Sequence, residues 1–154
     1  MAASIGKKVP DFKAESTAGE FHLKACQGNK LVIYFYPRDN TPGCTTESQD
    51  FASHYQDFKK AGCEIVGISR DKLKSHENFK AKFDFPFELI SDPEELVCEA
   101  FGVMKMKNMY GKQVRGIERS TFLIGADGKL LQEWRGVKVP GHVDEVLKAV
   151  KALK

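Results

Sequence analysis

The chain has 154 residues, of which 42% are hydrophobic, and this is the length and composition of one globular domain. Its 11 Phe, 4 Tyr and 1 Trp exclude an intrinsically disordered chain. The 24 basic and 21 acidic residues leave a net charge of +3, and no basic run exceeds two residues, which argues against nucleic acid as a partner. We predict a single domain over residues 1–154, without internal repeats or linkers.

Membrane and metal chemistry are not expected from this sequence. The longest apolar run, residues 31–36, falls far short of the ~18 residues that a membrane helix needs, and residues 1–7 lack a hydrophobic signal core. We therefore expect a cytoplasmic protein without membrane contact. The four cysteines form no C-x-x-C pair, which argues against zinc and against a secreted disulfide framework: Cys26, Cys44, Cys63 and Cys98.

The first half of the chain predicts a βαβ unit. After an irregular stretch, the apolar run at 31–36 is typical of a central strand that is covered on both faces, and Pro37 ends it. One helix should follow and end near Gly62, because apolar side chains recur at helical spacing: Phe51, Tyr55 and Phe58. Residues 64–69 give a second buried strand, which should run parallel to the first.

The second half continues the alternation of strands and helices. We predict helices over 72–83, from 91–94 to Gly102, and after 140–142, with strands at 87–90, 120–124 and 129–134. The turn at 126–128 should join the last two strands as a hairpin. The sum is an α/β fold, with a mixed central sheet and helices on both faces.

A reactive thiol is expected where the first central strand passes into the following helix. Chemistry in open α/β sheets lies beyond the carboxyl ends of the strands, and Thr41 and Pro42 suit the N-cap and first position of a helix. Cys44 would then occupy the third helical position, where free backbone amides and the helix dipole favour a thiolate. The Thr41 hydroxyl would either cap the helix or donate to the sulfur. The alternative is that Cys44 fills a small apolar niche.

These residues resemble the peroxiredoxins. Pro37, Thr41 and Cys44 satisfy the pattern P-x-x-x-T/S-x-x-C, and the string 34–45 is similar to the bacterioferritin comigratory protein, or peroxiredoxin Q, branch. Further matches follow in order at 67–71, 89–92, 110–112 and 119–124. The resemblance implies a thioredoxin-like fold, no metal or organic cofactor, and the reduction of hydrogen peroxide and organic hydroperoxides.

The resemblance also assigns roles to the site residues. Cys44 would be the peroxidatic cysteine, whose thiolate attacks the O–O bond and becomes a sulfenic acid. The Thr41 hydroxyl, the Cys44 amide and the Arg119 guanidinium would stabilise the negative charge on the leaving oxygen, and Pro37 would shield the sulfur from water. From the residues alone, Arg119 could equally be a solvated charge at the end of a strand.

The resolving step departs from the pattern of many relatives. Two common positions of the second cysteine are occupied here by Gln49 and Lys80. Cys63 and Cys98 are expected to be packed, and Cys26 is expected to be the most exposed of the remaining thiols. We therefore predict a one-cysteine cycle, in which thioredoxin, or glutathione with glutaredoxin, removes the oxygen from Cys44.

Other functions and features stay open at this point. A thiol–disulfide oxidoreductase is disfavoured because Glu47 stands where C-x-x-C needs its second cysteine, whereas a redox sensor or holdase remains an alternative. Glu47 and Arg38 are expected to be exposed or ion-paired. Residues 104–109 are expected to form either a flexible lip of the site or a passage from a strand to a loop. The chain is expected to be monomeric. The histidines are expected in polar or solvent-side surroundings, with surface or packing roles and not catalytic ones: His22, His54, His76 and His142.

Overall fold

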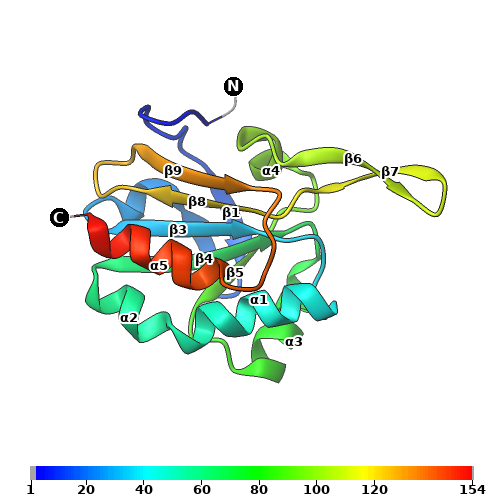
Figure 1. The fold of residues 1–154 in the computed structure, drawn as a ribbon, viewed down its shortest axis with the longest axis horizontal. Helices are drawn as coiled ribbons and strands as arrows, with labels where there is room; N and C mark the ends of the chain where they lie inside the picture. Colours follow the sequence, from blue (N-terminus) through cyan, green and yellow to red (C-terminus); the bar gives the residue numbers. More distant parts are fainter. Residues whose placement is uncertain (1–2, 154) are drawn as a thin grey trace.

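A seven-stranded mixed sheet forms the centre of the molecule in the computed structural model, which describes residues 3–153 (Figure 1). Its strand order is β2-β1-β5-β4-β3-β8-β9, in which β3, β4 and β5 are parallel and the other pairings are antiparallel. The strands are β1 (Lys13–Ser16), β2 (Gly19–His22), β3 (Lys30–Phe35), β4 (Cys63–Ser69), β5 (Glu88–Ser91), β8 (Ser120–Ile124) and β9 (Leu130–Arg135). The mixed sheet agrees with the prediction.

Helices cover the two faces of the sheet unequally (Figure 1). One face carries α1 (Pro42–Ser53), α2 (Tyr55–Lys60), α3 (Leu73–Phe83) and α5 (His142–Ala152), while the other carries the short α4 (Leu96–Ala100) and the 3-10 turn η1 (Leu23–Cys26). Among residues 3–153, no helix is long and apolar enough to span a bilayer.

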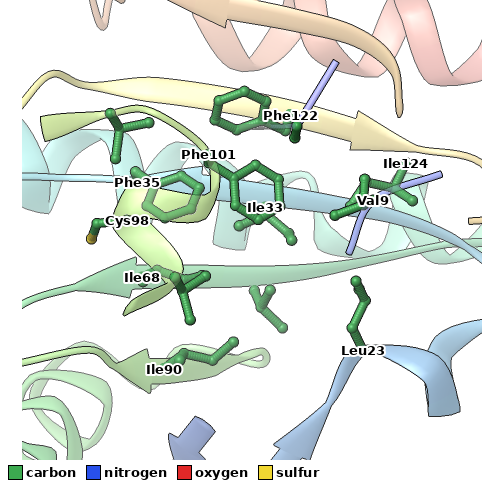
Figure 2. Packing of buried hydrophobic residues seen from close by; sticks show 14 of the residues in the cluster. Val9, Leu23, Ile33, Phe35, Ile68, Ile90, Cys98, Phe101, Phe122 and Ile124 are labelled. Atoms are coloured by element: carbon green, nitrogen blue, oxygen red, sulfur yellow. The ribbon is translucent and has the colours of Figure 1, made fainter. Parts of the chain in front are cut away.

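Strand β3 contributes to both hydrophobic layers, because successive side chains of a strand point to opposite faces. Ile33 and Phe35 lie in the layer under α4, together with Phe101 and Phe122 (Figure 2). The alternate residues of the strand, among them Tyr34, pack against α1, α2, α3 and α5. Such a strand is apolar without interruption, which is the pattern from which it was predicted.

The first helix is shorter than predicted, because it is interrupted at His54, which separates α1 from α2. The carbonyl of Asp50 accepts hydrogen bonds from the Ser53 hydroxyl and from the His54 amide, and the ring of His54 also contacts it. Polar side chains that compete for a helical carbonyl interrupt the regular ladder. The apolar spacing across the break nevertheless holds, because Phe51 and Phe58 are both fully buried.

Helix α4 begins later than the predicted 91–94. The carboxylate of Asp92 accepts the amides of Val97 and Cys98 at 3.2 and 2.7 Å, so the intervening residues form a turn and the helix starts beyond them. Glu95 adopts the left-handed conformation at the N-cap, with φ 65°. Leu96, the first residue of the helix, is 71% exposed.

A second, two-stranded sheet was not predicted. Strand β6 (Met104–Met109) pairs with β7 (Lys112–Ile117) in an antiparallel hairpin that projects from the body (Figure 1). Residues 104–109 are thus a regular strand, and Lys107 at its centre is bonded back to the carbonyl of Ile117. The base of this hairpin leads directly to Arg119.

Candidate active site

Cys44 lies where β3 gives way to α1, as predicted. Thr41 is the N-cap with extended backbone (φ −85°, ψ 152°), Pro42 is the first helical residue, and Cys44 is in the first turn. The amides of Gly43 and Cys44 precede the first intrahelical bond, which Thr45 donates to the carbonyl of Thr41, so they remain free for a ligand. The Cys44 side chain is 1% exposed in this state.

Arg119 reaches Cys44 from the start of β8, the strand next to β3. Strand β8 runs antiparallel beside β3, and Ser120 is paired with Phe35, so the residue before β8 lies at the carboxyl end of β3. Its guanidinium donates to the Cys44 sulfur at 3.3 Å, although the two residues are 75 positions apart in the chain. The alternative of a solvated charge at the end of a strand is wrong for Arg119.

The same guanidinium also holds Glu47. Arg119 Nη1 donates to Glu47 Oε1 at 2.6 Å, and the Glu47 side chain is fully buried. Among residues 3–153, the second carboxylate oxygen of Glu47 has no hydrogen-bond partner. Glu47 was expected to be either exposed or ion-paired, and it is ion-paired; its place beside the sulfur was not foreseen, and its only sequence signal is a position one helical turn after Cys44.

Burial decides the ionisation of this acid. Removal of Glu47 from water raises its pKa to about 7, against the attraction of Arg119, which acts in the opposite direction. Burial also acts against the charge on Arg119, but Glu47 and Cys44 together outweigh it and raise the pKa of the guanidinium. One permanent cation therefore faces two acidic groups, the thiol and the carboxyl.

Gly43 leaves room for the arginine. A Cβ at this position would lie 3.2 Å from Arg119 Nη2, a tight contact that would push the guanidinium aside. The absence of a side chain thus allows the arginine to lie against the first turn of α1.

Thr41 and Pro37 lie near the sulfur in the chain, but the hydroxyl does neither of the things predicted for it. Thr41 makes no side-chain cap, and its hydroxyl donates to the carbonyl of Arg38 at 3.0 Å instead of to the sulfur. The physical reason is the tight turn that precedes the helix, which brings that carbonyl within reach. Pro37 is half-buried and Arg38 is exposed.

The three other thiols lie away from Cys44. Cys63 opens β4 opposite Lys30, the first residue of β3, so five strand steps of ~3.3 Å put it about 16 Å from the end where the site lies. Cys26 is half-buried in η1, before the start of β3, and Cys98 packs under α4 on the other face of the sheet. Disulfide formation needs Cα atoms within about 7 Å, a limit that Cys63 exceeds, and all four cysteines are free in this structure.

These thiols are also poor nucleophiles. Burial, the largest cause in each case, raises the pKa of Cys26, raises that of Cys63 to about 12, and raises that of Cys98 still further. A thiol reacts as its thiolate, so the raised pKa values make these three less reactive at neutral pH than an ordinary cysteine. The predicted burial of Cys63 and Cys98, and the greater exposure of Cys26, are confirmed.

Two of the histidines are buried. His76 is fully buried and His142 is 5% exposed, and each bonds to a polar side chain, so a packing role fits both while a place on the solvent side does not. Burial, helped by the charge of Arg119, lowers the pKa of His142 to about 4, so its ring is neutral and bonds to the hydroxyl of Thr121 at 2.8 Å. Which of the two expected roles, surface or packing, each histidine takes is decided by long-range packing.

Comparison with known proteins gives the site its context. Residues 5–133 match the model of the AhpC/TSA family. The chain is 60% identical over 130 residues to peroxiredoxin Bcp of Xanthomonas campestris, which covers 84% of this chain and 81% of that protein. It is 45% identical over 152 residues to peroxiredoxin Bcp of Bacillus subtilis, covering 98% and 97%.

Solved structures agree with these relatives. A structure of Xanthomonas campestris peroxiredoxin Q superposes with a TM-score of 0.88 at 55% identity, covering 92% of this chain and 90% of that one. Another, with a TM-score of 0.87, is described as giving insights into the alkyl peroxide reduction activity of the Xanthomonas bacterioferritin comigratory protein. The chain therefore belongs to the AhpC/TSA family and, within it, to the Bcp or peroxiredoxin Q type of peroxiredoxin, enzymes that reduce hydroperoxides at the expense of thiols.

Proposed function

We propose that Cys44 is the peroxidatic residue of this enzyme and that it works in a one-cysteine cycle completed by an external thiol. The observation that carries the proposal is the 3.3 Å contact between Arg119 Nη2 and the Cys44 sulfur. A fixed cation at this distance stabilises a thiolate and is already in place for the charge that develops on the leaving oxygen. Hydrogen peroxide and organic hydroperoxides are the proposed substrates.

The chemistry balances without a cofactor. The thiolate attacks the nearer peroxide oxygen, the O–O bond breaks, and the farther oxygen leaves as hydroxide or alkoxide and takes up a proton. Cys44 becomes a sulfenic acid. Because the Thr41 hydroxyl hydrogen is bonded to the Arg38 carbonyl, its oxygen is left as an acceptor for the peroxide proton, and we assign it this role. Pro37 is proposed to shield the sulfur.

The positions of the other thiols support the external resolution. A first external thiol condenses with the sulfenic acid, releasing water and forming a mixed disulfide, and a second thiol reduces that disulfide. Lys80, at one of the positions where relatives carry a second cysteine, is bonded to the carbonyls of Phe85 and Phe87 at 3.0 Å each. This position thus serves to attach α3 to the segment that follows it.

Intact mass spectrometry tests this cycle. After one equivalent of hydrogen peroxide, we expect a gain of one oxygen located at Cys44, and glutathione should convert this species to an adduct. Cys44→Ser should gain no oxygen at that position. The triple variant Cys26→Ser, Cys63→Ser, Cys98→Ser is the matched control and should keep its steady-state turnover.

Three outcomes would contradict the proposal. An immediate internal disulfide, or loss of turnover in a folded triple variant, would show that a second cysteine of the chain resolves Cys44. A sulfenic acid that forms but turns over with neither thioredoxin nor glutathione and glutaredoxin would favour the redox-sensor alternative. The choice between these reductants, the monomeric state and the cytoplasmic location stay predictions; the four free thiols are consistent with a reducing compartment.

A further inference from the structure

A buried acid–histidine pair connects α3 to the active-site loop, which is the segment between β3 and α1. Asp39, in the loop between β3 and α1, is 5% exposed, and His76 on α3 is fully buried. Asp39 Oδ2 lies 2.7 Å from His76 Nδ1 and accepts a hydrogen bond from the Ser75 hydroxyl at 2.8 Å. Asp39 Oδ1 accepts the hydroxyl of Tyr36 at 2.7 Å. Both oxygens of this carboxyl are therefore fully engaged.

The contacts of the ring fix the number of protons that the pair holds. His76 Nε2 lies 2.9 Å from the carbonyl oxygen of Ile90, which only accepts, so this nitrogen carries a hydrogen. His76 Nδ1 faces a carboxyl oxygen of Asp39 at 2.7 Å, and two lone pairs would repel at that distance. A second proton must therefore lie between them. Whether it belongs to the ring or to the acid, the pair is neutral overall, which allows it to be buried.

The same loop is held from a second side. The backbone amide of Asp39 donates to Asp71 Oδ2 at 2.8 Å, and the Ser69 hydroxyl donates to the same oxygen at 2.6 Å. Asp39, Asp71 and His76 have ligand atoms within 4.8 Å of one another, as a metal site would. However, the Asp39 oxygens and Asp71 Oδ2 already accept hydrogen bonds, so the cluster is accounted for as a hydrogen-bond network that joins the loop to β4 and α3.

We propose that Asp39 and His76 are positioning residues for the peroxide reaction, which place Cys44 against Arg119 before the substrate arrives. Neither is a catalytic residue, since neither contacts the sulfur. Asp39 is followed by Asn40 in the left-handed conformation, with φ 63°, and then by the N-cap of α1. The network thus fixes the point from which the chain turns into the reactive helix. This inference rests on the proposed role of Cys44.

Preorganisation of this kind affects the chemical step more than the accessibility of the thiol. A misplacement of about 1 Å at a reacting atom costs up to about 10²-fold in rate, because the in-line approach and the donor distances are lost together. Alkylation by iodoacetamide needs a reachable thiolate but not the peroxide geometry. The two rates together separate a loss of positioning from a general loss of reactivity.

The experiment compares these two rates in single-turnover reactions of the full chain. We expect Asp39→Ala and His76→Ala each to slow the oxidation of Cys44 by hydrogen peroxide about 10- to 100-fold, with alkylation unchanged or faster when it is compared at a pH where the thiol of each protein is fully ionised. The double variant should be no slower than either single variant, because both break the same connection. Asp39→Asn should stay within about threefold of wild type, since its amide can donate to His76 Nδ1 while Nε2 keeps its bond.

Lys80→Ala is the matched control. Lys80 lies one turn beyond His76 on α3 and is bonded to the segment that follows the helix, not to the active-site loop. This variant should lose stability but keep the wild-type oxidation rate. If the alanine variants fail to fold, Asp39→Ser and His76→Gln take their place, with the same slowing expected. Circular dichroism and thermal unfolding establish which variants are folded.

Three results would overturn the proposal: wild-type oxidation rates in the folded alanine variants of Asp39 and His76 or in their replacements Asp39→Ser and His76→Gln, equal slowing in Lys80→Ala, or additive losses in the double variant. Because the oxidation of Cys44 is measured directly, a failure of the external thiols to complete the cycle leaves this comparison intact. If wild-type Cys44 is not oxidised by hydrogen peroxide at all, the proposed function fails and this inference fails with it, whereas a wild type that is oxidised no faster than its folded alanine variants overturns the positioning alone.

Discussion

The guanidinium of Arg119 is shared between two acids, the Cys44 thiol and the Glu47 carboxyl. With both ionised, one cation would have to balance two buried negative charges. Burial raises the pKa of Glu47 to about 7, so this carboxyl is partly protonated at neutral pH and leaves more of the cation for the sulfur. Among residues 3–153, one oxygen of Glu47 has no hydrogen-bond partner, so the contact of this carboxyl with Arg119 is made through its other oxygen.

Glu47 should give the folded protein a distinct pH dependence. Its pKa is about 7 in the folded protein and near the ordinary glutamate value of 4.5 in the unfolded chain. Between these values the native state holds more protons, so the free energy of unfolding falls as pH rises, by up to roughly 3 kcal/mol over the whole window. Glu47→Gln removes this titration and should flatten the fall, as measured by urea unfolding at pH 4.5, 6 and 7.5.

His142 acts in the opposite direction in the same range and must be separated from Glu47. Its pKa is lowered to about 4 by burial and by Arg119, so between that value and 6.5 the unfolded chain binds more protons and stability rises with pH. The difference between wild type and Glu47→Gln cancels this contribution. Parallel stability curves for the two proteins would contradict the assignment.

At this scale the sequence was informative where a residue type and its spacing have a chemical meaning. The N-cap, Pro42 and Cys44 followed from helix-capping rules, and Arg119 came from the family resemblance. The burial of His76 and of Glu47 could not be read in the same way, because it depends on which distant elements pack against them. The Thr41 hydroxyl was assigned to the sulfur or a cap, yet a nearer acceptor was available in the backbone of Arg38.

Among the elements, α1 must change for the cycle to proceed. Cys44 is 1% exposed, so we expect an external thiol to reach its sulfur only after the first turn of α1 has opened. Helix α3, by contrast, is attached at both ends: His76 binds Asp39 and Ile90, and Lys80 binds the carbonyls of Phe85 and Phe87. We therefore expect the rearrangement to be confined to the start of α1.

Hydrogen exchange measured by mass spectrometry tests this confinement. In the adduct of Cys44 with glutathione, peptides from α1 (Pro42–Ser53) should lose protection relative to the reduced protein, whereas peptides from α3 (Leu73–Phe83) should keep it. The Cys44→Ser protein, treated with hydrogen peroxide and glutathione in the same way, provides the baseline. Equal loss of protection in α3 would show that both helices unfold together.

The elements with strong apolar periodicity were predicted well, and the irregular ones were not. Strands β3 and β4 are continuous apolar runs, and the β8–β9 hairpin has its turn at 126–128. The β6–β7 hairpin escaped prediction because most of its residues are exposed and show no apolar face. The start of α4 was displaced because the side chain of Asp92 binds amides five and six residues ahead, which no local rule anticipates.

For the whole molecule, the topology of the sheet creates the active site. Strands β3 and β8 are neighbours, although 84 residues of the chain lie between Phe35 and its partner Ser120. Their antiparallel pairing places Arg119 beside the end of β3. The family resemblance predicted this arrangement in outline. The unequal distribution of the helices, with four on one face and α4 on the other, was beyond the sequence because short helices carry little periodic signal.

The contact between Arg119 and Cys44 is tested most directly by the rate at which hydrogen peroxide oxidises Cys44 in a single turnover. Arg119→Lys keeps a positive charge but loses the fork that serves the sulfur and Glu47 together. We predict that this rate falls about 10²- to 10³-fold in a variant that remains folded, because a fixed donor to the developing charge is lost. A folded Arg119→Lys protein that reacts with peroxide at the wild-type rate would contradict the account.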